Sequence, residues 1–334
     1  MRALMLWLMV ALVGCVGGDP SSTPSAMIEH AWSLIDTRYA LFPDKSVDWQ
    51  SVKAESLRQL ESAGGDAADE QALYTVLTDM LSTLEDAHIN VITPFAVSWV
   101  PAWFEARAPQ YDADLVHRHI LGFEFSRIGA VEYGRLGDLG YLRIAHLESM
   151  PSAETIDLIF EGFSDVDGLI LDLRANGGGE LEIANAWLGR FIDAAVAGWR
   201  IEIKNGPEHD ALSDPELQGV SPSGGRRYTG PLAVLVDGRT YSGANLLAFN
   251  FAEREQTVLV GERTGGGGGS TAWFELPNGW LMRLPVRRLT DRRGDSTEQG
   301  IEPDVQMSLD LEAVAQGRDS IIEAAMMVLE RYTE

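Results

Sequence analysis

The sequence predicts an α/β fold with a helical subdomain near its N-terminal end, and three observations predict it. Apolar residues recur at helical spacing in the first quarter of the chain, and helical patterns alternate with short apolar runs after residue 152. The length of 334 residues, with 45% hydrophobic and 23% charged residues, is that of an ordinary globular protein with room for a large core. Alternating helices and strands indicate parallel pairing in the core.

The helical subdomain is expected at residues 26–95. Ile28, Trp32 and Ile35 fall on one face of a first helix, and the same spacing continues to about residue 84, which predicts about three helices. From residue 89 the pattern changes to short strand-like runs. We therefore expect a connecting β segment at 96–135, in which LVHRHILGFEF is one of the strands.

The α/β core is expected at residues 136–310. Its elements should be helices at 153–163, 180–195 and 243–254 and strands at 168–173, 231–236 and 257–261. A hairpin that turns at Asn278-Gly279 should follow, because Asn-Gly suits a tight turn between two strands. The last segment, 311–334, is expected to form a C-terminal helix.

The N-terminal segment 1–15 resembles a bacterial lipoprotein signal. It has one Arg, an uninterrupted apolar run and a Leu-Val-Gly-Cys ending, and the run is too short to span a bilayer stably. Lipidation is then expected at Cys15, with 16–25 as a flexible tether, so that the protein is exported to the cell envelope and faces the periplasm or the cell surface. A plain secretory signal is the alternative. Cys15 is the only cysteine, so neither an internal disulfide nor a cysteine nucleophile is expected.

Charge bounds the partners. The chain has 26 basic and 50 acidic residues, a net charge of −24, which would repel phosphate backbones and argues against nucleic acid. Contact with a membrane is expected only through the lipid, and the oligomeric state stays open. His117 and His119 alternate along an expected strand, but no third ligand is near them in sequence, so no metal is predicted.

Ser242 is the first candidate for chemistry, in the stretch AVLVDGRTYSGANLLAFNF. It stands where an apolar run passes into a helical pattern. A serine there is either a nucleophile or a helix N-cap, and the local pattern alone favours the cap. The loop ANGGG, with Gly177 and Gly178, is a second candidate, because glycines at a helix start can receive an oxyanion or simply form a tight turn.

His88 and Glu298 give weaker signals. His88 lies in LEDAHI, where a helical pattern gives way to a strand, and Glu298 precedes a Gly-Ile-Glu-Pro-Asp turn. A histidine or glutamate in such a place is more often structural or solvated than catalytic. The five glycines 265–269 read on their own as a surface linker.

Four motifs in this order, DLRANGGG, VLVDGRTYSGAN, VGERTGGG and GIEPD, resemble the C-terminal-processing (tail-specific) serine peptidases, a family that includes the tricorn core and the interphotoreceptor retinoid-binding proteins. The resemblance covers about residues 28–330. It implies a crotonase-like ββα core, Ser242 as nucleophile, and an oxyanion hole from the N–H of Gly243 and one of Gly177 and Gly178. No metal or organic cofactor is implied.

The resemblance also separates two branches. The processing branch uses a lysine about twenty-five residues after the serine, where this chain has Gly267, and no lysine follows Ser242. The tricorn-like branch uses a histidine and a late glutamate, which His88 and Glu298 match. In some relatives the glutamate stands at the position of Thr297, so the register of Glu298 differs by one residue, and Asp295 and Glu302 are weaker candidates. A Ser-His-Glu triad follows from this comparison.

The expected function is that of a serine endopeptidase acting on proteins or peptides. The segment 96–135 is too short for the PDZ domain of the processing proteases, so selection of substrate C-termini is not expected to carry over. Asp172 and Arg174 are expected to hold the glycine loop, although Arg174 could bind a substrate carboxylate. The alternatives are a non-catalytic module that binds a hydrophobic ligand on the same fold, and an esterase, which the absence of G-x-S-x-G around Ser242 disfavours.

Overall fold

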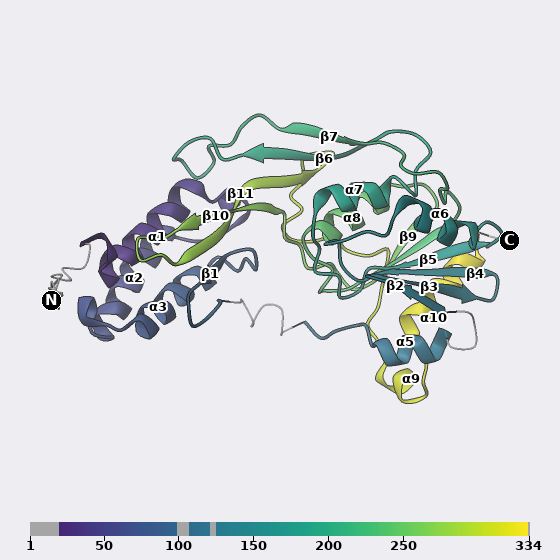
Figure 1. Ribbon diagram of the computed structural model, residues 1–334, viewed down its shortest axis with the longest axis horizontal. Helices are drawn as coiled ribbons and strands as arrows, with labels where there is room; N and C mark the ends of the chain where they lie inside the picture. The colour runs from purple at the N-terminus through teal and green to yellow at the C-terminus, as the bar shows by residue number, and fades with distance from the viewer. Residues whose placement is uncertain (1–19, 99–106, 121–124, 333–334) are drawn as a thin grey trace, which may run out of the picture.

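The computed structural model describes residues 20–98, 107–120 and 125–332. The expected signal segment 1–15, with Cys15, lies outside these residues. Within them, no helix has both the length and the apolar character needed to cross a bilayer. The described chain forms a helical lobe and an α/β lobe, joined by a long sheet (Figure 1).

The helical lobe contains three helices, α1 (Pro24–Arg38), α2 (Trp49–Ser62) and α3 (Glu70–Ser82). Each begins at a capping residue whose side chain accepts a backbone N–H: Thr23, Asp48 and Asp69. The apolar faces of these helices meet each other, and the lobe's core is completed by Met282 and Leu284 from a distant strand. The sequence prediction of about three helices in this region agrees with the structure.

A five-stranded sheet joins the two lobes, in the order β1-β11-β6-β7 with β10 also paired to β11. Its strands are β1 (Asn90–Ile92), β6 (Val196–Ile203), β7 (Glu216–Val220), β10 (Gly269–Glu275) and β11 (Leu281–Asp291). The first residues of β11 pair with β1 and β10 beside the helical lobe, and its last residues pair with β6 beside the α/β lobe. β10 and β11 are the expected hairpin, with Gly279 at a φ of 83° in its turn.

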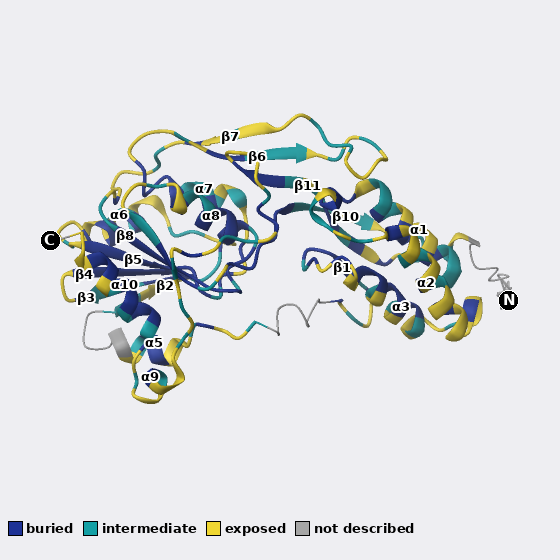
Figure 2. Ribbon diagram, turned by 180° about the vertical axis from the view of Figure 1, so that it is seen from behind, coloured by how far each residue is buried: buried dark blue, intermediate teal, exposed yellow. Residues whose placement is uncertain are grey.

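The α/β lobe is built on a seven-stranded sheet in the order β12-β9-β8-β5-β4-β3-β2. Its strands are β2 (Phe125–Ile128), β3 (Val131–Leu136), β4 (Leu139–Ile144), β5 (Gly168–Asp172), β8 (Leu232–Val236), β9 (Thr257–Gly261) and β12 (Val305–Gln306). The pairs from β4 to β12 are parallel, and β2, β3 and β4 are antiparallel. Every residue of β5 and β8 is buried, as Figure 2 shows in dark blue, because helices cover both faces of the sheet.

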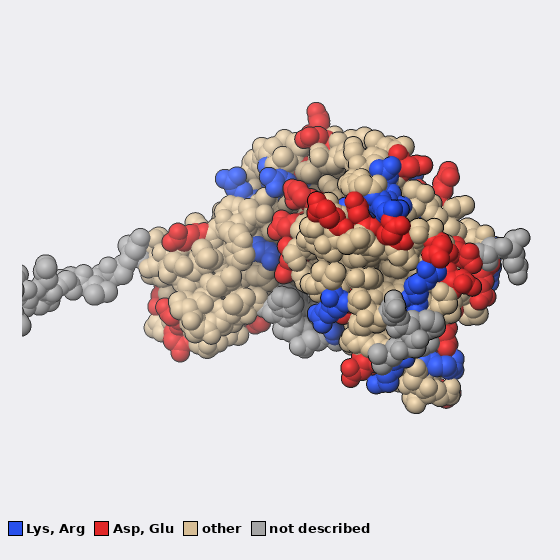
Figure 3. Space-filling model, turned by 45° about the vertical axis from the view of Figure 1, so that its right-hand side comes forward, with Lys and Arg blue, Asp and Glu red and all other residues tan. Residues whose placement is uncertain are grey.

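Helices α6 (Ala153–Glu161), α7 (Leu181–Leu188) and α8 (Gly243–Ala252) pack on one face, and α10 (Ser320–Glu330) packs on the other. Acidic and basic side chains are interspersed over this lobe in the view of Figure 3. The architecture is therefore a mixed α/β fold, in agreement with the predicted class. It places the start of α8 and the end of β5 at the carboxyl edge of the parallel strands, where α/β folds carry their sites.

One expected element is wrong. Residues Ala113–Ile120, expected as a strand in the connecting β segment 96–135, form the helix α5. The physical reason is a cap: Asp112 Oδ1 accepts the N–H of Leu115 at 2.9 Å, and the neighbouring Leu115 and Val116 are both buried, as one helix face allows. The C-terminal segment 311–334 contains the short helix α9 (Leu311–Ala315) and then α10, which is the expected C-terminal helix and begins after its cap Asp319.

Candidate functional site

Ser242 stands at the end of a buried strand and the start of a helix. β8 ends at Val236, and α8 begins at Gly243, so that Ser242 occupies the N-cap position. Its hydroxyl makes no capping hydrogen bond. Its Oγ lies 2.9 Å from Nε2 of His88, and its backbone has φ 55° and ψ −124°. A positive φ is costly for a residue with a side chain and is typical of strained functional positions.

Neighbouring loops hold this strained turn in place. The N–H of Ser242 donates to the carbonyl of Gly266 at 2.8 Å, and the N–H of Tyr241 donates to the carbonyl of Asn176 at 2.9 Å. Asp237 accepts the N–H of Ala175 at 2.9 Å, another residue with a positive φ, of 56°. The serine turn and the glycine loop thus brace each other, which offsets the strain of both.

The glycine loop lies directly against the serine turn. A Cβ built on Gly178 would lie 2.7 Å from the carbonyl oxygen of Tyr241, 2.8 Å from the nitrogen of Gly243 and 2.9 Å from Cβ of Ser242. The N–H of Gly178 already donates to Oδ1 of Asn176 at 2.9 Å. Gly243, as the first residue of α8, has no intrahelical acceptor for its N–H. Of the three amides expected to form an oxyanion hole, Gly178 is therefore committed elsewhere, and those of Gly243 and Gly177 remain candidates.

His88 reaches Ser242 from the helical lobe, after α3 and before β1. It is buried, and its backbone N–H donates to Oδ1 of Asp86 at 2.8 Å. On the side of the ring away from Ser242, Nδ1 lies 3.3 Å from the hydroxyl of Tyr241 and 3.7 Å from Oδ1 of Asp86. The structure thus brings together two of the three expected triad residues, from segments 154 residues apart.

Glu298 has other contacts. Its Oε1 lies 2.6 Å from Nζ of Lys45, and its Oε2 accepts the N–H of Gly268 at 2.7 Å. These are the hydrogen bonds of its carboxylate in the part of the chain that the structure describes. The direct contact with the imidazole that the triad prediction implies is therefore not among them. Thr297, at the alternative register, donates its hydroxyl to the carbonyl of Leu289 at 2.8 Å.

Burial dominates the electrostatics of the site. Burial, with smaller contributions from the charges of Arg283 and Lys45, lowers the pKa of His88 to about 4, against the opposing charge of Asp86. Burial and the charge of Asp86 raise the pKa of Glu298 to about 7, although Lys45 opposes this. Near neutral pH, His88 is therefore uncharged and able to accept a proton, as a general base requires.

Comparison with known proteins identifies the family of this chain. The model of Peptidase family S41 matches residues 138–307, about half of the chain. The chain belongs to peptidase family S41. It is therefore a member of a family of serine-type peptidases, in agreement with the expected class of enzyme.

Three relatives illustrate the similarity. The carboxy-terminal processing protease CtpA of Bacillus subtilis is 29% identical over 174 residues, which are 52% of this chain and 35% of the relative. A crystal structure of a candidate peptidase from Parabacteroides merdae is 31% identical with a TM-score of 0.86, covering 92% of this chain and 97% of the other. Mature CPAF in complex with lactacystin, at 13% identity and a TM-score of 0.70 over 92% and 97% of the two chains, shares the fold. The match spans only about a third of the length of the curated relatives.

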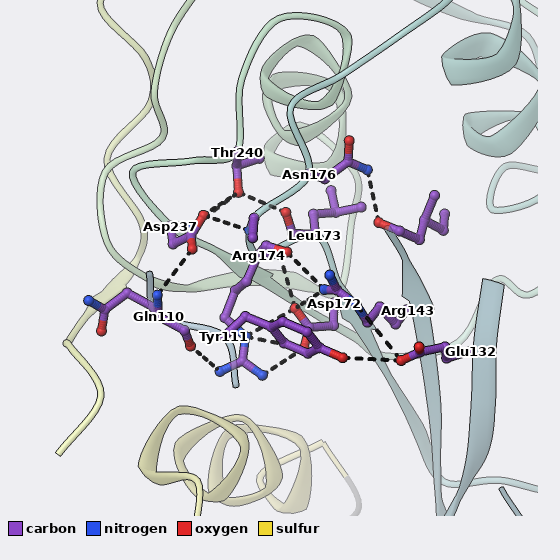
Figure 4. A network of polar contacts seen from close by, with 12 residues as sticks. Gln110, Tyr111, Glu132, Arg143, Asp172, Leu173, Arg174, Asn176, Asp237 and Thr240 are labelled. Carbon is purple, nitrogen blue, oxygen red and sulfur yellow. Dashed lines mark hydrogen bonds and ion pairs between the residues drawn. The ribbon is translucent and has the colours of Figure 1, made fainter. Parts of the chain in front are cut away.

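Behind the glycine loop of this S41 chain lies a fully buried charge network (Figure 4). Arg174 donates to Asp172 at the end of β5, to Asp319 at the start of α10 at 2.9 Å, and to the carbonyl of Gln110 at 2.9 Å. Its side chain is 0% exposed, so it cannot reach a substrate. Of the two expected roles for Arg174, the structure supports holding the loop. Asp172 shares this role, and the hydroxyl of Tyr141 donates to it at 2.8 Å.

A polar pocket of about 330 Å³ opens beside the site, between the two lobes. Lys45, Glu85 and Arg107 line it together with Tyr241 and Glu298. No group of three His, Cys, Asp or Glu side chains suited to a metal ion occurs in the described part of the chain. His117, one of the two histidines considered above as metal ligands, is not among the residues that line this pocket. Its Nε2 lies 3.4 Å from Oε2 of Glu132 in the buried charge network.

Sequence reasoning missed three residues of this site: Lys45, Asp86 and Tyr241. Asp86 lies two residues before His88, and Tyr241 lies directly before Ser242. Neither carries a local pattern of its own that separates it from an ordinary residue next to a catalytic one. Lys45 carried no local signal, since its partner Glu298 is 253 residues away in sequence.

Proposed function

We propose that this protein is a serine endopeptidase that cleaves proteins or peptides through an acyl-enzyme on Ser242. The observation that carries the proposal is the 2.9 Å contact between Oγ of Ser242 and Nε2 of His88, at a turn whose positive φ aims the hydroxyl away from the cap position. The family supports the reaction class. The proposal also includes a crotonase-type core and a place in the tricorn-like branch of the family, as the sequence motifs imply.

In this mechanism His88 takes the hydroxyl proton of Ser242 on Nε2 while Oγ attacks the carbonyl carbon of the scissile peptide bond. The carbonyl oxygen becomes an oxyanion, which the N–H of Gly243 and that of Gly177 would stabilise. His88 then passes the proton to the leaving amine. Water, deprotonated by the same imidazole, hydrolyses the ester and restores the serine.

Glu298 stays a prediction as the third member of the triad. Its buried carboxylate lies in the same polar cluster as His88, but its hydrogen bonds go to Lys45 and Gly268. Any influence on the imidazole would therefore be electrostatic. Selection of substrate C-termini through a PDZ domain is not part of the proposal, because residues 96–135 offer too short a segment for one.

Export is a separate part of the proposal. The signal at residues 1–15 would direct lipidation of Cys15 and anchor the chain in the cell envelope, facing the periplasm or the cell surface. A mass measurement of the mature N-terminus tests it. A chain that keeps residues 1–14 would contradict it.

The activity is tested by incubating the purified chain with casein and following the peptides released. Ser242→Ala and His88→Ala should each reduce turnover by at least about 10⁴-fold while circular dichroism shows a folded protein. Glu253→Gln, an exposed carboxylate on the α/β lobe, serves as the matched control. Retained activity in Ser242→Ala would overturn the mechanism. Saturable uptake of a fluorescent hydrophobic ligand without any turnover would favour the binding-module alternative.

A further inference from the structure

We propose that Asp86 and Tyr241, rather than Glu298, hold the imidazole of His88 in the orientation and tautomer that general-base catalysis requires. This inference rests on the proposed function, because it concerns the residues that position the base. It assigns both residues a positioning role, since neither contacts Ser242 Oγ among the contacts described.

The two residues form a continuous hydrogen-bonded chain behind the ring. Nδ1 of His88 lies 3.3 Å from the hydroxyl of Tyr241, which in turn lies 3.4 Å from Oδ1 of Asp86. The same Oδ1 accepts the backbone N–H of His88 at 2.8 Å. Oδ2 of Asp86 accepts the hydroxyl of Tyr39 at 2.8 Å. Both the ring and the backbone of His88 are therefore fixed by one carboxylate.

These hydrogen bonds through Tyr241 to Asp86 also select the tautomer of the His88 imidazole. A carboxylate only accepts hydrogen bonds, so the hydroxyl of Tyr241 donates toward Asp86, and its oxygen is left to accept from Nδ1–H of His88. Burial raises the pKa of Tyr241, as do the charges of Asp86 and Glu298, so the phenol keeps its proton. With the proton of the neutral imidazole on Nδ1, Nε2 is free to accept the proton of Ser242. In the reverse tautomer Nδ1 would be an acceptor as well, so the single proton of the Tyr241 hydroxyl could serve Nδ1 or Asp86 but not both.

The carboxylate of Glu298 is already used. Lys45 and the N–H of Gly268 occupy one oxygen each, at 2.6 and 2.7 Å. The charge that raises the pKa of His88 against burial is that of Asp86. Once the imidazole takes the serine proton, Asp86 is therefore the anion placed to stabilise the cation.

Packing on Tyr241 supports the same assignment. A Cβ at Gly267 would lie 2.5 Å from Cζ of Tyr241, and the φ of Gly267 is 85°, so only glycine leaves room for this ring. The ring centroids of Tyr241 and His88 are 4.8 Å apart. The loop at Gly267 therefore packs against the ring of Tyr241, whose hydroxyl lies near Nδ1 of His88 and Oδ1 of Asp86.

The test compares Asp86→Asn, Tyr241→Phe and Glu298→Gln in the full chain, with kcat and KM measured on a fluorogenic peptide cleaved by the wild type. We expect kcat to fall about 10²- to 10³-fold in Asp86→Asn and about 10-fold or more in Tyr241→Phe, with KM within about threefold. Glu298→Gln should lose much less than Asp86→Asn. In Asp86→Asn the acid limb of the kcat/KM profile should also move to lower pH, since the anion that favours the imidazolium is gone.

Selective ¹⁵N labelling of histidine supplies a readout that a purely structural role would not move. The wild type and Glu298→Gln should show His88 protonated on Nδ1 near neutral pH, and Asp86→Asn should shift the signal toward a mixture of tautomers. If Glu298→Gln abolishes turnover while Asp86→Asn and Tyr241→Phe keep wild-type kcat, Glu298 is the orienting residue and our assignment is overturned. Activity in Ser242→Ala would instead remove the proposed function itself.

An independent observation concerns Arg283 on β11. Its register partners are Asn90 on β1 and Trp273 on β10. Its neighbours in the strand, Met282 and Leu284, point into the helical core, so Arg283 points to the opposite face of the sheet. Its Nε is buried without a hydrogen-bond partner in the described part of the chain, although the residue as a whole is only partly buried.

We infer that Arg283 binds a carboxylate of the peptide substrate. The guanidinium fork matches a carboxylate with two parallel hydrogen bonds. Its register partner Asn90 comes two residues after His88, and its charge acts on both His88 and Tyr241, so it lies near the catalytic pair. Trp273, 51% exposed on the same face and with its ring 6.0 Å from the guanidinium carbon, offers an apolar surface beside it. This inference also rests on the proposed function.

Paired peptides distinguish the two sources of a carboxylate, an acidic side chain and a free C-terminus. One pair differs by Glu and Gln near the cleaved bond, and the other by a free and an amidated C-terminus. The wild type should prefer one carboxylate partner by about 10-fold or more in kcat/KM, and Arg283→Gln should lose that preference. Arg287→Gln, an exposed arginine on the same strand, is the control. An equal preference in Arg283→Gln, or none in the wild type, would overturn the inference while leaving peptide cleavage intact.

Discussion

Two clusters of buried charge lie close to the glycine loop, and they differ in how the charge is compensated. In the first, which we call the core cluster, Arg174 lies between Asp172 and Asp319. In the second, the site cluster, Asp86 and Glu298 share the neighbourhood of His88 with Lys45 and with the charge of Arg283. Lys45 contacts Glu298 at 2.6 Å and the carbonyl of Glu85 at 3.2 Å, while neutral donors hold Asp86.

The difference appears in the pKa values. Burial acts against the charge of Arg174, but Asp172 and Asp319 outweigh it and raise the pKa of the guanidinium. Burial also acts against the charge of Asp172, but the charge and hydrogen bonds of Arg174, together with Arg143 and Tyr141, outweigh it and lower the pKa of Asp172. In the site cluster burial outweighs the charges that oppose it, so the pKa of His88 falls to about 4 and that of Glu298 rises to about 7. Direct ion pairs keep the core cluster charged over a wide pH range, whereas the site cluster can exchange protons, which catalysis needs.

The largest effect is expected from breaking the core cluster. Arg174→Met would remove the cation that pairs directly with Asp172 and Asp319 and leave Asp172 with Arg143 at 3.7 Å, so we expect the free energy of unfolding to fall by about 3–5 kcal/mol. Urea denaturation followed by circular dichroism measures it. Arg318→Met, which removes an exposed ion pair with Glu323, should cost less than about 1 kcal/mol and is the control. Equal losses in the two variants would mean that the core cluster contributes no more than a surface pair.

The next effect concerns the glycine loop beside Ser242. Gly178→Ala would push a Cβ to within 2.9 Å of Ser242 and Gly243 at a φ of 95°, and we expect kcat to fall about 10²- to 10³-fold because the oxyanion position is obstructed. Gly177→Ala is the matched control, since its Cβ would meet nothing within 4 Å. Peptide turnover measures both. A similar loss in Gly177→Ala would show that the effect comes from general loop disorder.

The sequence was sufficient for much of the α/β lobe and less so for the site. β9 and the hairpin at Asn278-Gly279 match their expected places, because each is set by a local pattern of apolar and turn residues. The prediction of a strand where α5 forms was wrong. Histidines alternate with apolar residues there as they would in a strand, but the cap at Asp112 starts a helix. Local pattern thus predicts elements well wherever one period dominates.

For the site, the motifs around Ser242 and His88 led to a pair that lies 2.9 Å apart, although the local pattern alone favoured a helix cap. Nothing local could place Glu298. Its partners are Lys45 and Gly268, and a contact across 253 residues leaves no trace in periodicity or turn chemistry. The choice between Asp86 and Glu298 behind the imidazole depends on side-chain directions that only the folded chain defines.

Stability against pH sharpens the contrast between the clusters. The unfolded chain binds a proton on His88 below a pKa of about 6.5 but the folded chain only below about 4, so stability should fall by about 3 kcal/mol as the pH drops through that window. Glu298 acts oppositely. Its folded pKa of about 7 exceeds the unfolded value, so stability should fall as the pH rises from about 4.5 to 7.

Urea denaturation between about pH 4 and pH 8 measures both slopes. Because the two windows overlap between about pH 4.5 and 6.5, the two slopes oppose each other in the wild type. His88→Gln should therefore leave the fall in stability with rising pH, and Glu298→Gln should leave the rise. Variants of the core cluster should keep the wild-type profile. A Glu298→Gln profile identical to that of the wild type would mean that Glu298 stays charged in the folded protein.

The smallest effect is expected at the rim of the core cluster. The hydroxyl of Tyr111 donates to Glu132 at 3.1 Å, and its ring lies 3.4 Å from the guanidinium carbon of Arg143 (Figure 4). Tyr111→Phe removes the hydrogen bond and keeps the ring, and Glu132 retains Arg143 and His117 within 4 Å. We therefore expect a loss of only about 1 kcal/mol in the free energy of unfolding. A loss of about 3 kcal/mol or more would mean that the charge at Glu132 depends on the phenol, so that compensation in the core cluster extends beyond its ion pairs.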